Sequence, residues 1–354
     1  WGWDDVAPLF RRGETYRRGG DALRGNSGEL AVEDDAHCDS TSEAVMAAFE
    51  EIGVPAVADY NATQQFGTFH YQVTMRNGRR CSAADAFLRP VSRRSNLQII
   101  TGAHCRRVLL EGRRATGVEI ERKAGVQTIH AAREVILAAG AYHSPQILML
   151  SGIGPASHLH AMGIAVQHDS PGVGANLQDH YILTMSWRLR SGIFSYNDEL
   201  RGLRLVWNVL RYAASGQGPM TIPAAQTGAF VKSDPALDLP DIQFHCLPVT
   251  GELDAAVDGK PRLSPYPGLT LAPCVLRPTS RGRVLLARPD PHAVPDIVHN
   301  YLATDEDQRL SLRAMRMARE LAAAPSLARH PHRTQRQALV LVGCEIVVHN
   351  VRHS

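Results

Sequence analysis

The sequence predicts a mixed fold, in which an α/β domain is followed by an α+β domain whose sheet is largely antiparallel. Three observations lead to this prediction. Short apolar runs typical of strands recur between residues 97 and 137, residues 138–154 change from small residues to a helical pattern, and strand-like runs return between residues 181 and 287 around a long amphipathic helix. The chain has 354 residues, which is enough for two domains.

The most informative local pattern lies in residues 134–154. The run Val-Ile-Leu at 135–137 is typical of a strand buried on both faces of a parallel sheet, and the small residues 138–141 leave room for a ligand to reach the backbone. Ser144 then predicts a helix N-cap and Pro145 the first helical residue. Because free amides and the dipole at a helix start attract phosphate, this stretch predicts a place for a nucleotide cofactor.

The elements before this stretch follow from patterning. Residues 4–10 and 41–52 predict short helices, which we interpret as packing elements. Apolar residues alternate with polar ones over 69–75, as in a half-buried strand, and a turn at Asn77-Gly78 follows. A helix is expected to begin at Ser82 and to stop before Pro90. Four consecutive strands are then expected, joined in part by a turn at Glu111-Gly112, at 97–101, 105–110, 115–120 and 134–137.

The composition changes after His180, where we place the domain boundary. The strands expected beyond it are 181–189, 227–232, 242–247, 269–276 and 283–287. Between the first two lies the amphipathic helix, with Leu200, Leu203, Trp207 and Leu210 on one stripe. A last long helix begins after Thr304 with a capping-box-like start and is expected to bury Leu310, Ala314, Met317 and Leu321.

The bulk composition excludes several classes. The net charge is +3 with basic residues scattered among acidic ones, and aromatic residues make up 6%, so we expect no nucleic-acid partner. The six cysteines are far apart and include no Cys-x-x-Cys pair, so neither a zinc site nor a disulfide scaffold is indicated. We also expect no metal, no membrane span, no secretory leader and a cytoplasmic location.

Two motifs in order resemble a known family. Gly140-Ala141, Ser144-Pro145, Ile147-Leu148 and Ser151-Gly152-Ile153-Gly154 resemble a signature of the glucose-methanol-choline (GMC) oxidoreductases, and residues 171–180 resemble the block that follows it. Weaker likenesses at 71–84, 280–284 and 300–302 extend the resemblance from about Trp1 to about Ala328. The resemblance implies FAD as cofactor and oxidation of a primary alcohol to an aldehyde by an electron acceptor that the sequence does not identify. It also implies a partial FAD-binding, Rossmann-like domain at 1–180 and a substrate domain at 181–328.

The resemblance also nominates site residues. On the cofactor side these are Arg80, Ser82, Cys105, Gly140, Ala141, Ser144 and Pro145. On the substrate side, Gln226 stands where choline-specific relatives are acidic, which makes a cationic substrate less favoured, and His245 matches a polar pocket position. Structural roles stay open for Cys105 as a core residue, for Arg80 at the surface, for Ser82 as a cap and for His245 within its strand.

The sequence departs from the family in two places. A Gly-x-Gly-x-x-Gly fingerprint for the pyrophosphate is missing, since neither Gly152-Ile153-Gly154 nor residues 172–177 complete it. The family's catalytic His motif is also missing, and His330-Pro331-His332 does not continue as that motif does. We therefore expect a fragment that neither holds FAD nor turns over by itself, with no catalytic residue assigned. The alternative is a non-catalytic remnant that binds a small molecule or protein. A hydrolase using Ser144 or Ser151 is disfavoured, because neither lies in a Gly-x-Ser-x-Gly elbow.

The ends of the chain carry two further expectations. Residues 329–354 change character, and we interpret them as an aberrant tail from a frameshift or mis-splicing, with a genuine terminal hairpin as the alternative; Trp1 suggests a partial clone. Unpaired strand edges in an incomplete sheet would also make the isolated chain poorly soluble.

Overall fold

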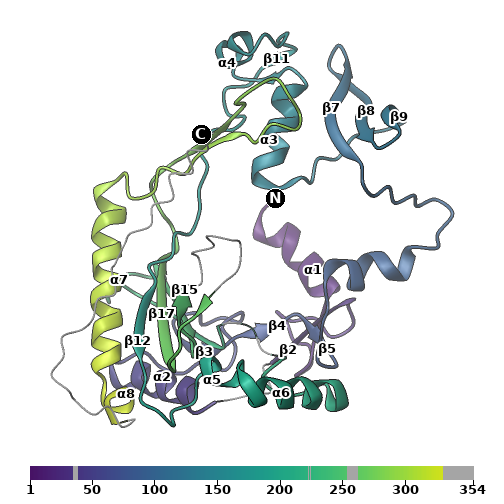
Figure 1. Ribbon diagram of the computed structural model, residues 1–354. Helices are drawn as coiled ribbons and strands as arrows, with labels where there is room; N and C mark the ends of the chain where they lie inside the picture. The colour runs from purple at the N-terminus through teal and green to yellow at the C-terminus, as the bar shows by residue number, and fades with distance from the viewer. Residues whose placement is uncertain (35–38, 222, 224, 253–261, 330–354) are drawn as a thin grey trace. The chain divides into compact units, whose positions relative to one another are not determined.

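The computed structural model describes residues 1–34, 39–221, 223, 225–252 and 262–329. The chain divides into two compact units (Figure 1). Unit 1 comprises Trp1–Leu97, His180–Arg277 and the described residues from Arg309 onward; unit 2 comprises Gln98–Asp179 and Pro278–Gln308. His180, the expected boundary, thus begins a stretch of unit 1. The assignment of residues 1–180 to FAD binding, 181–328 to substrate binding and 329–354 to an aberrant tail stays a prediction, and the tail lies almost wholly outside the described residues.

Unit 1 contains the larger sheet. Its elements are α1 (Trp3–Gly13), β1 (Glu14–Tyr16), β2 (Leu30–Asp34), α2 (Ser40–Glu51), β3 (Gly67–His70), β4 (Gln72–Val73), β5 (Met75–Arg76), β6 (Arg79–Arg80), η1 (Ala84–Leu88), η2 (Arg89–Val91), β12 (Met185–Arg188), α5 (Tyr196–Glu199), α6 (Gly202–Ser215), β13 (Thr227–Val231), β14 (Ile242–Leu247), β15 (Gly251–Glu252), β16 (Arg262–Leu263), β17 (Gly268–Val275) and α8 (Pro325–Arg329). α7 (Asp305–Ala323) begins in unit 2 and continues into unit 1.

The five-stranded sheet of unit 1 runs in the order β12-β17-β14-β13-β3, and every neighbouring pair is antiparallel. The predicted antiparallel sheet is thereby confirmed. Along β14 the side chains alternate: Ile242, Phe244 and Cys246 are fully buried, whereas the residues between them are partly exposed. Phe49 of α2 meets Phe244 edge-on at 5.5 Å between ring centroids, so α2 covers this face of the sheet. Gln243 and His245 project from the opposite face of β14.

The start of α2 shows why that helix is well placed. Asp39 is its N-cap, and the carboxylate accepts hydrogen bonds from the amides of Thr41 and Ser42 at 2.9 Å each. Apolar residues then recur at helical spacing, and Val45, Ala48 and Phe49 are buried. The predicted helix is confirmed, with its N-cap at Asp39, two or three residues before the hydroxyl residues Thr41 and Ser42 that the sequence suggested.

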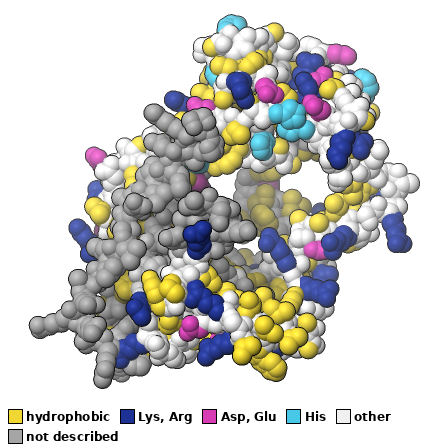
Figure 2. Space-filling view, in the orientation of Figure 1, with side chains coloured by type: hydrophobic (Ala, Val, Ile, Leu, Met, Phe, Trp, Pro, Cys, Tyr) yellow, Lys and Arg dark blue, Asp and Glu magenta, His cyan; other side chains and the backbone are white. Residues whose placement is uncertain are grey.

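Two other helices of unit 1 expose apolar side chains. α1 begins after Gly2 and buries none of its residues, so the predicted helix is present but its interpretation as a packing element is not supported. On α6 the predicted apolar stripe is present but faces solvent, with Leu203 88% and Trp207 68% exposed. Figure 2 shows hydrophobic side chains gathered over this helix. Amphipathic patterning predicted the helix correctly, but it did not predict that the apolar face of the helix is exposed.

In the residues that the structure describes, unit 2 is built of smaller sheets, the helices α3 and α4 and the start of α7. Its elements are β7 (His104–Glu111), β8 (Arg114–Arg122), β9 (Gly125–His130), α3 (Gly140–Leu150), β10 (Ile153–Gly154), α4 (Ala156–Ala161), β11 (His168–Asp169), β18 (Arg283–Leu285) and β19 (Asp296–Val298). β7, β8 and β9 form an antiparallel meander, in which the first two strands and the turn at Gly112 are as predicted and the third was missed. Met149, Leu159 and Leu286 form a buried cluster that ties α3 and α4 to the segment after β18.

Two predicted strands of unit 2 are wrong. Residues 97–101 and 134–137 have no strand assignment, and Ile136 is 79% exposed. The physical reason is that an apolar run becomes a strand only where neighbours complete its hydrogen bonds, and no described strand pairs with either segment. The parallel pairs among the described strands are the short β1–β2 and β10–β11.

Candidate functional site

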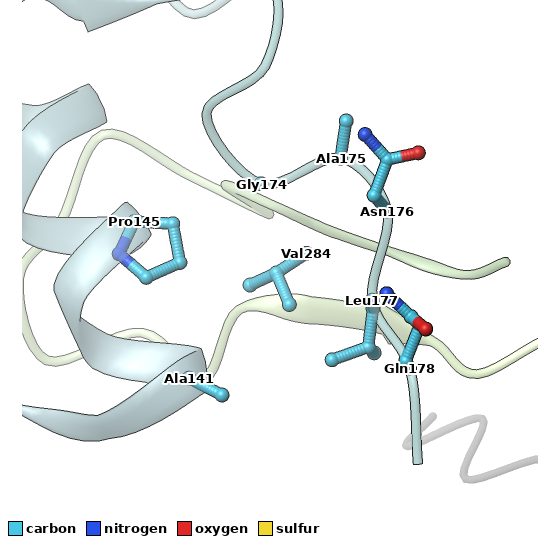
Figure 3. Close-up of a pocket in the computed structure, with 8 residues that line it drawn as sticks. All are labelled: Ala141, Pro145, Gly174, Ala175, Asn176, Leu177, Gln178 and Val284. Carbon is cyan, nitrogen blue, oxygen red and sulfur yellow. The ribbon is translucent and has the colours of Figure 1, made fainter. Parts of the chain in front are cut away.

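The first candidate site is an open pocket within unit 2. Its volume is about 430 Å³, and it lies between the first half of α3, the loop 174–178 and β18 (Figure 3). The residues that line it are Ala141, Pro145, Gly174, Ala175, Asn176, Leu177, Gln178 and Val284. Ala141 and Pro145 are two of the predicted cofactor residues, and the loop belongs to the second sequence motif. Two motifs about 30 residues apart in the chain therefore meet at one cavity.

The start of α3 differs from the prediction. The helix begins at Gly140 with Ala139 as N-cap, so Ser144 is not the N-cap and Pro145 is not the first helical residue. Ser144 Oγ instead accepts a hydrogen bond from the amide of Ala139 at 3.2 Å, so it supports the helix start from inside the helix. Pro145 has no amide hydrogen, so the carbonyl of Ala141, four residues earlier, receives no helical hydrogen bond. The proline thus weakens the first turn on the side that lines the pocket.

Gly140 has a positive φ of 81°, and an added Cβ would meet no atom within 4 Å. The backbone at this point is open to a ligand, as the sequence predicted for a small-residue turn. Contact of Gly140 with a cofactor stays a prediction, since Gly140 itself does not line the pocket described above.

The loop 174–178 is held against β18. Leu177 and Gly282 exchange backbone hydrogen bonds of 3.0 and 2.8 Å, and the amide of Val284 donates to the carbonyl of Gly174 at 2.7 Å. A Cβ on Gly174 would lie 2.1 Å from the carbonyl oxygen of Val284, so only glycine allows this approach. Gly174 therefore serves a loop that packs against a strand, which agrees with the rejection of residues 172–177 as a dinucleotide fingerprint.

A group in unit 2 was missed as a site by sequence reasoning. Tyr301 donates a hydrogen bond to Asp179, its ring stacks on His299 at 4.9 Å, and His299 Nε2 lies 3.0 Å from Tyr142 Oη on α3. Burial, with Asp179 second, raises the pKa of Tyr301. Asp179 and Tyr301 both lie in segments that carry the family resemblance, but no sequence pattern indicates that they meet.

The second candidate site lies on the face of the unit 1 sheet opposite to the side chain of Phe244. His245 Nδ1 lies 2.8 Å from Tyr71 Oη, and Gln243 Nε2 donates to the same oxygen at 2.9 Å. The two rings of Tyr71 and His245 stack at 5.7 Å. Burial, followed by the charge of His180, lowers the pKa of His245. Because its pKa is lowered, His245 is mainly a neutral imidazole at pH 7; it is partly buried and contacts the Tyr71 hydroxyl, which Gln243 also contacts.

Gln226, the other predicted substrate residue, is fully buried. Its Oε1 accepts a hydrogen bond from Ser42 Oγ at 3.0 Å, and the backbone carbonyl accepts from the amide of Tyr71 at 2.9 Å. In this structure Gln226 joins the start of α2 to the sheet. A direct contact with substrate remains a prediction.

The remaining predicted cofactor residues have local structural roles. Ser82 begins the η1 turn through a reciprocal pair with Asp85: each residue's amide donates to the other's side chain at 3.2 Å. Arg80 is exposed on β6, and Cys105 is a partly buried free thiol on β7 whose pKa is raised by burial. None of the three lines the pocket of unit 2. The predicted roles of these residues in cofactor binding are not tested by this geometry.

Two kinds of feature are missing from the described part of the chain. Among those residues there is no cluster of three or more metal-ligand side chains, and no helix is long and apolar enough to cross a membrane.

Comparison with known proteins gives the family. Residues 1–182 match the N-terminal model of the GMC oxidoreductases and residues 278–349 match the C-terminal one, which extends past Ala328. An alcohol dehydrogenase [acceptor] from Pseudomonas putida is 38% identical over 338 residues, which are 93% of this chain and 59% of that protein. An oxygen-dependent choline dehydrogenase from Photobacterium profundum is 35% identical over 331 residues, 92% of this chain and 57% of that protein.

Solved structures agree on the fold. Pyridoxine 4-oxidase from Mesorbium loti superposes with a TM-score of 0.79 at 28% identity, covering 93% of this chain and 60% of that one. Formate oxidase from Aspergillus oryzae RIB40, an FAD enzyme, gives 0.82 at 25% identity, covering 92% and 62%. The chain thus spans about three fifths of the length of the relatives and structures named here. The predicted fold class is confirmed, and the chain belongs to the GMC oxidoreductase family, whose cofactor is FAD.

Proposed function

We propose that this chain is part of an FAD-dependent oxidoreductase that acts on the CH–OH group of a primary alcohol. The observation that carries the proposal is the pocket of unit 2, where the start of α3 and the loop 174–178 line one cavity. The names of the two relatives, an alcohol dehydrogenase and a choline dehydrogenase, support the same reaction class.

The residues of the pocket fit one end of a dinucleotide. Its volume of about 430 Å³ is within the range of roughly 300–1,000 Å³ usual for small-molecule sites. None of its eight lining side chains is charged, so apolar contact and backbone groups would hold a ring system there. When bound, FAD supplies the acceptor for the hydride of the alcohol. The chain's part is to shape the pocket and to present backbone at Gly140.

We propose a neutral alcohol as substrate. Gln226 carries no charge where choline-specific relatives are expected to be acidic, and the partly buried His245 is mainly neutral at pH 7 because burial and His180 lower its pKa. A quaternary ammonium would find no carboxylate at either residue. The proposal therefore extends to the class of neutral alcohols and to no single member of it.

We further propose that the chain alone has little or no turnover. The family's His motif is missing from the sequence, and loss of a general base costs roughly 10²–10⁴-fold in rate. A chain that binds alcohol without turnover would serve as a binding remnant of such an enzyme.

The test uses the purified chain in two steps. An absorption spectrum over the visible flavin bands is expected to show no retained flavin. Titration with FAD at millimolar concentration, followed by amide NMR, is then expected to shift the signals of residues 139–145 and 174–178 together. Retained flavin would contradict the expected weak binding, and shifts confined to other residues would remove the pocket from the proposal.

A matched pair of variants sharpens the result. Ala175→Trp fills the pocket, whereas Ala132→Trp changes an exposed alanine of the same unit that does not line it. We expect the FAD-induced shifts to weaken by about tenfold or more in the first variant and to stay within about twofold in the second, as steric exclusion requires. Equal effects in both variants would contradict the assignment of the pocket.

A further inference from the structure

A chain of four side chains lies beside the pocket of unit 2, and we call it the polar bridge: Tyr142, His299, Tyr301 and Asp179. At one end, Tyr142 directly follows the lining residue Ala141 on α3. At the other end, Asp179 directly follows Gln178, the last lining residue of the loop 174–178. Figure 3 shows Ala141 and Gln178 on different walls of the pocket. The two ends of the polar bridge are therefore attached to two different walls.

The contacts within the polar bridge run from one wall to the other. Tyr142 Oη lies 3.0 Å from His299 Nε2, and the rings of His299 and Tyr301 stack with their centroids 4.9 Å apart. Tyr301 then donates a hydrogen bond to the carboxylate of Asp179. Burial, followed by this carboxylate, raises the pKa of Tyr301, so its hydroxyl stays protonated and remains the donor. Two hydrogen bonds and one ring stack thus link α3 to the end of the loop.

The turn that carries Tyr301 has an uncommon backbone conformation. Asn300 and Leu302, on either side of it, have φ values of 57° and 56°. Asparagine tolerates this left-handed region, whereas a leucine there must be enforced by its surroundings. Asn300 Nδ2 donates to the carbonyl oxygen of Arg281 at 3.0 Å. Gln308 Nε2 donates to the carbonyl oxygen of Leu302 at 2.8 Å. These bonds fix the turn and with it the position of the Tyr301 ring.

The same turn packs against the backbone that holds the loop. An added Cβ at Gly282 would lie 2.1 Å from the carbonyl oxygen of Val298 and 2.7 Å from that of His299, so only glycine allows this approach. Gly282 is also the residue that exchanges backbone hydrogen bonds with Leu177 of the loop. The turn and the loop therefore meet at one glycine, and the polar bridge adds a second connection between them.

Backbone bonds hold the middle of the loop 174–178, whereas the polar bridge holds its end. Resting on the proposed function, we propose that His299 and Tyr301 are positioning residues that fix this loop relative to the start of α3 and thereby set the width of the pocket for one end of FAD. Neither residue lines the pocket, so both act through Tyr142 and Asp179.

The first test needs no cofactor. Tyr301→Phe removes the hydroxyl that reaches Asp179 and keeps the stacked ring. Amide NMR of this variant is expected to show shifted signals in residues 174–178 and also in residues 140–145, at the far end of the polar bridge. Changes confined to residues 298–303 would overturn the proposal and leave the proposed function standing.

Tyr212→Phe is the matched control. It removes the same group from unit 1, where the hydroxyl of Tyr212 donates to the carbonyl oxygen of Gly78 at 3.1 Å. This variant should leave the signals of both pocket walls unchanged. Equal changes at the pocket in Tyr212→Phe and Tyr301→Phe would show a general loss of stability and would contradict a positioning role.

Titration with FAD measures the effect on binding. Only signals of the folded chain are followed, so a loss of stability alone does not change the dissociation constant. Tyr301→Phe should weaken FAD binding by about fivefold, as expected for one lost hydrogen bond. Asp179→Asn keeps an oxygen that accepts from Tyr301 and should bind FAD more tightly than Asp179→Ala. An unchanged dissociation constant in Tyr301→Phe, or the reverse order of the Asp179 variants, would overturn the proposal.

A double-mutant cycle tests whether the polar bridge acts as one unit. Tyr142→Phe and Tyr301→Phe break it at opposite ends, so the double variant should bind FAD no more than about twofold more weakly than the weaker single variant. Effects that multiply would show two independent contributions and contradict a single bridge. A native chain that does not respond to FAD at either wall would remove the proposed function and the role toward FAD together, whereas the cofactor-free spectra test the bridge by themselves.

Discussion

An apolar run in each unit was predicted to form a strand, and only the run in unit 1 does so. Residues 242–247 form β14, which pairs with β13 on one side and β17 on the other and buries Phe244 completely. Residues 135–137 look equally strand-like in the sequence, yet no described strand pairs with them and Ile136 is 79% exposed. The comparison teaches that hydrophobicity makes a run capable of forming a strand, and that the neighbours decide whether it does.

The largest expected effect separates the two runs directly. Phe244→Ala should lower the free energy of unfolding by about 3–5 kcal/mol, because it leaves a cavity between the sheet and Phe49 of α2. Ile136→Ala should change it by less than about 0.5 kcal/mol, since the side chain is already in solvent. Urea denaturation measures both. A loss above about 2 kcal/mol at Ile136 would show that the run has a packing partner.

The starts of α2 and α3 also differ, because only one of them has a side-chain cap. α2 is capped by Asp39, which accepts from the amides of Thr41 and Ser42, whereas the N-cap of α3 is Ala139 and has no side-chain cap. Asp39→Ala should cost about 0.5–2 kcal/mol of stability in urea. Ala139→Gly, at the uncapped start of α3, is the control and should cost less. The reverse order would contradict the view that α2 depends on its cap.

The start of α7 allows a test by pH. Burial raises the pKa of Asp307, but hydrogen bonds from Ser280 and Thr279 outweigh it, so the pKa lies below its ordinary value of 3.8. A carboxyl whose pKa is lower in the folded than in the unfolded protein stabilises the fold at pH values above its unfolded pKa. This stabilisation is lost as the pH falls through its folded pKa.

Urea titrations from about pH 5 to about pH 2.5 measure this contribution. The native chain should lose more stability over that interval than Asp307→Asn, whose amide does not titrate. Parallel curves for the two proteins would remove Asp307 from the account of acid stability.

The smallest effect on stability is expected at α6. Leu203→Gln combined with Trp207→Gln should leave the unfolding free energy within about 0.5 kcal/mol, because both side chains are exposed. The double variant should, however, bind less of a hydrophobic dye and run closer to a monomer in gel filtration, since exposed apolar patches promote association. A native chain that already runs as a clean monomer would contradict the expected poor solubility.

Much of unit 1 follows from its sequence. Alternation over 242–247, the apolar spacing from Val45 to Phe49, and the Asn77-Gly78 turn each specify a local structure whose partners lie in the same unit. In unit 2 the hairpin at Gly112 followed for the same reason. The outcome at residues 135–137 could not be predicted, because strand formation there needs neighbouring strands. The start of α3 could not be predicted either, because Ser144 accepts a hydrogen bond from Ala139 inside the helix and does not cap it.

The candidate site shows the same division. Ala141 and Pro145 were named from the sequence as cofactor residues and residues 171–180 as a family motif, but nothing in the sequence indicated that the two segments line one pocket with Val284. His245 was named from its strand, whereas the contact with Tyr71 arises from two strands that β13 separates.

By itself the sequence determined the family resemblance and the antiparallel sheet, because these depend on local patterns of residue size and polarity. Only the tertiary structure decided which apolar runs became strands, which helix faces are buried and which distant side chains, such as Tyr71 and His245, come into contact. Those outcomes depend on distances between groups far apart in the chain, and local patterning does not encode such distances.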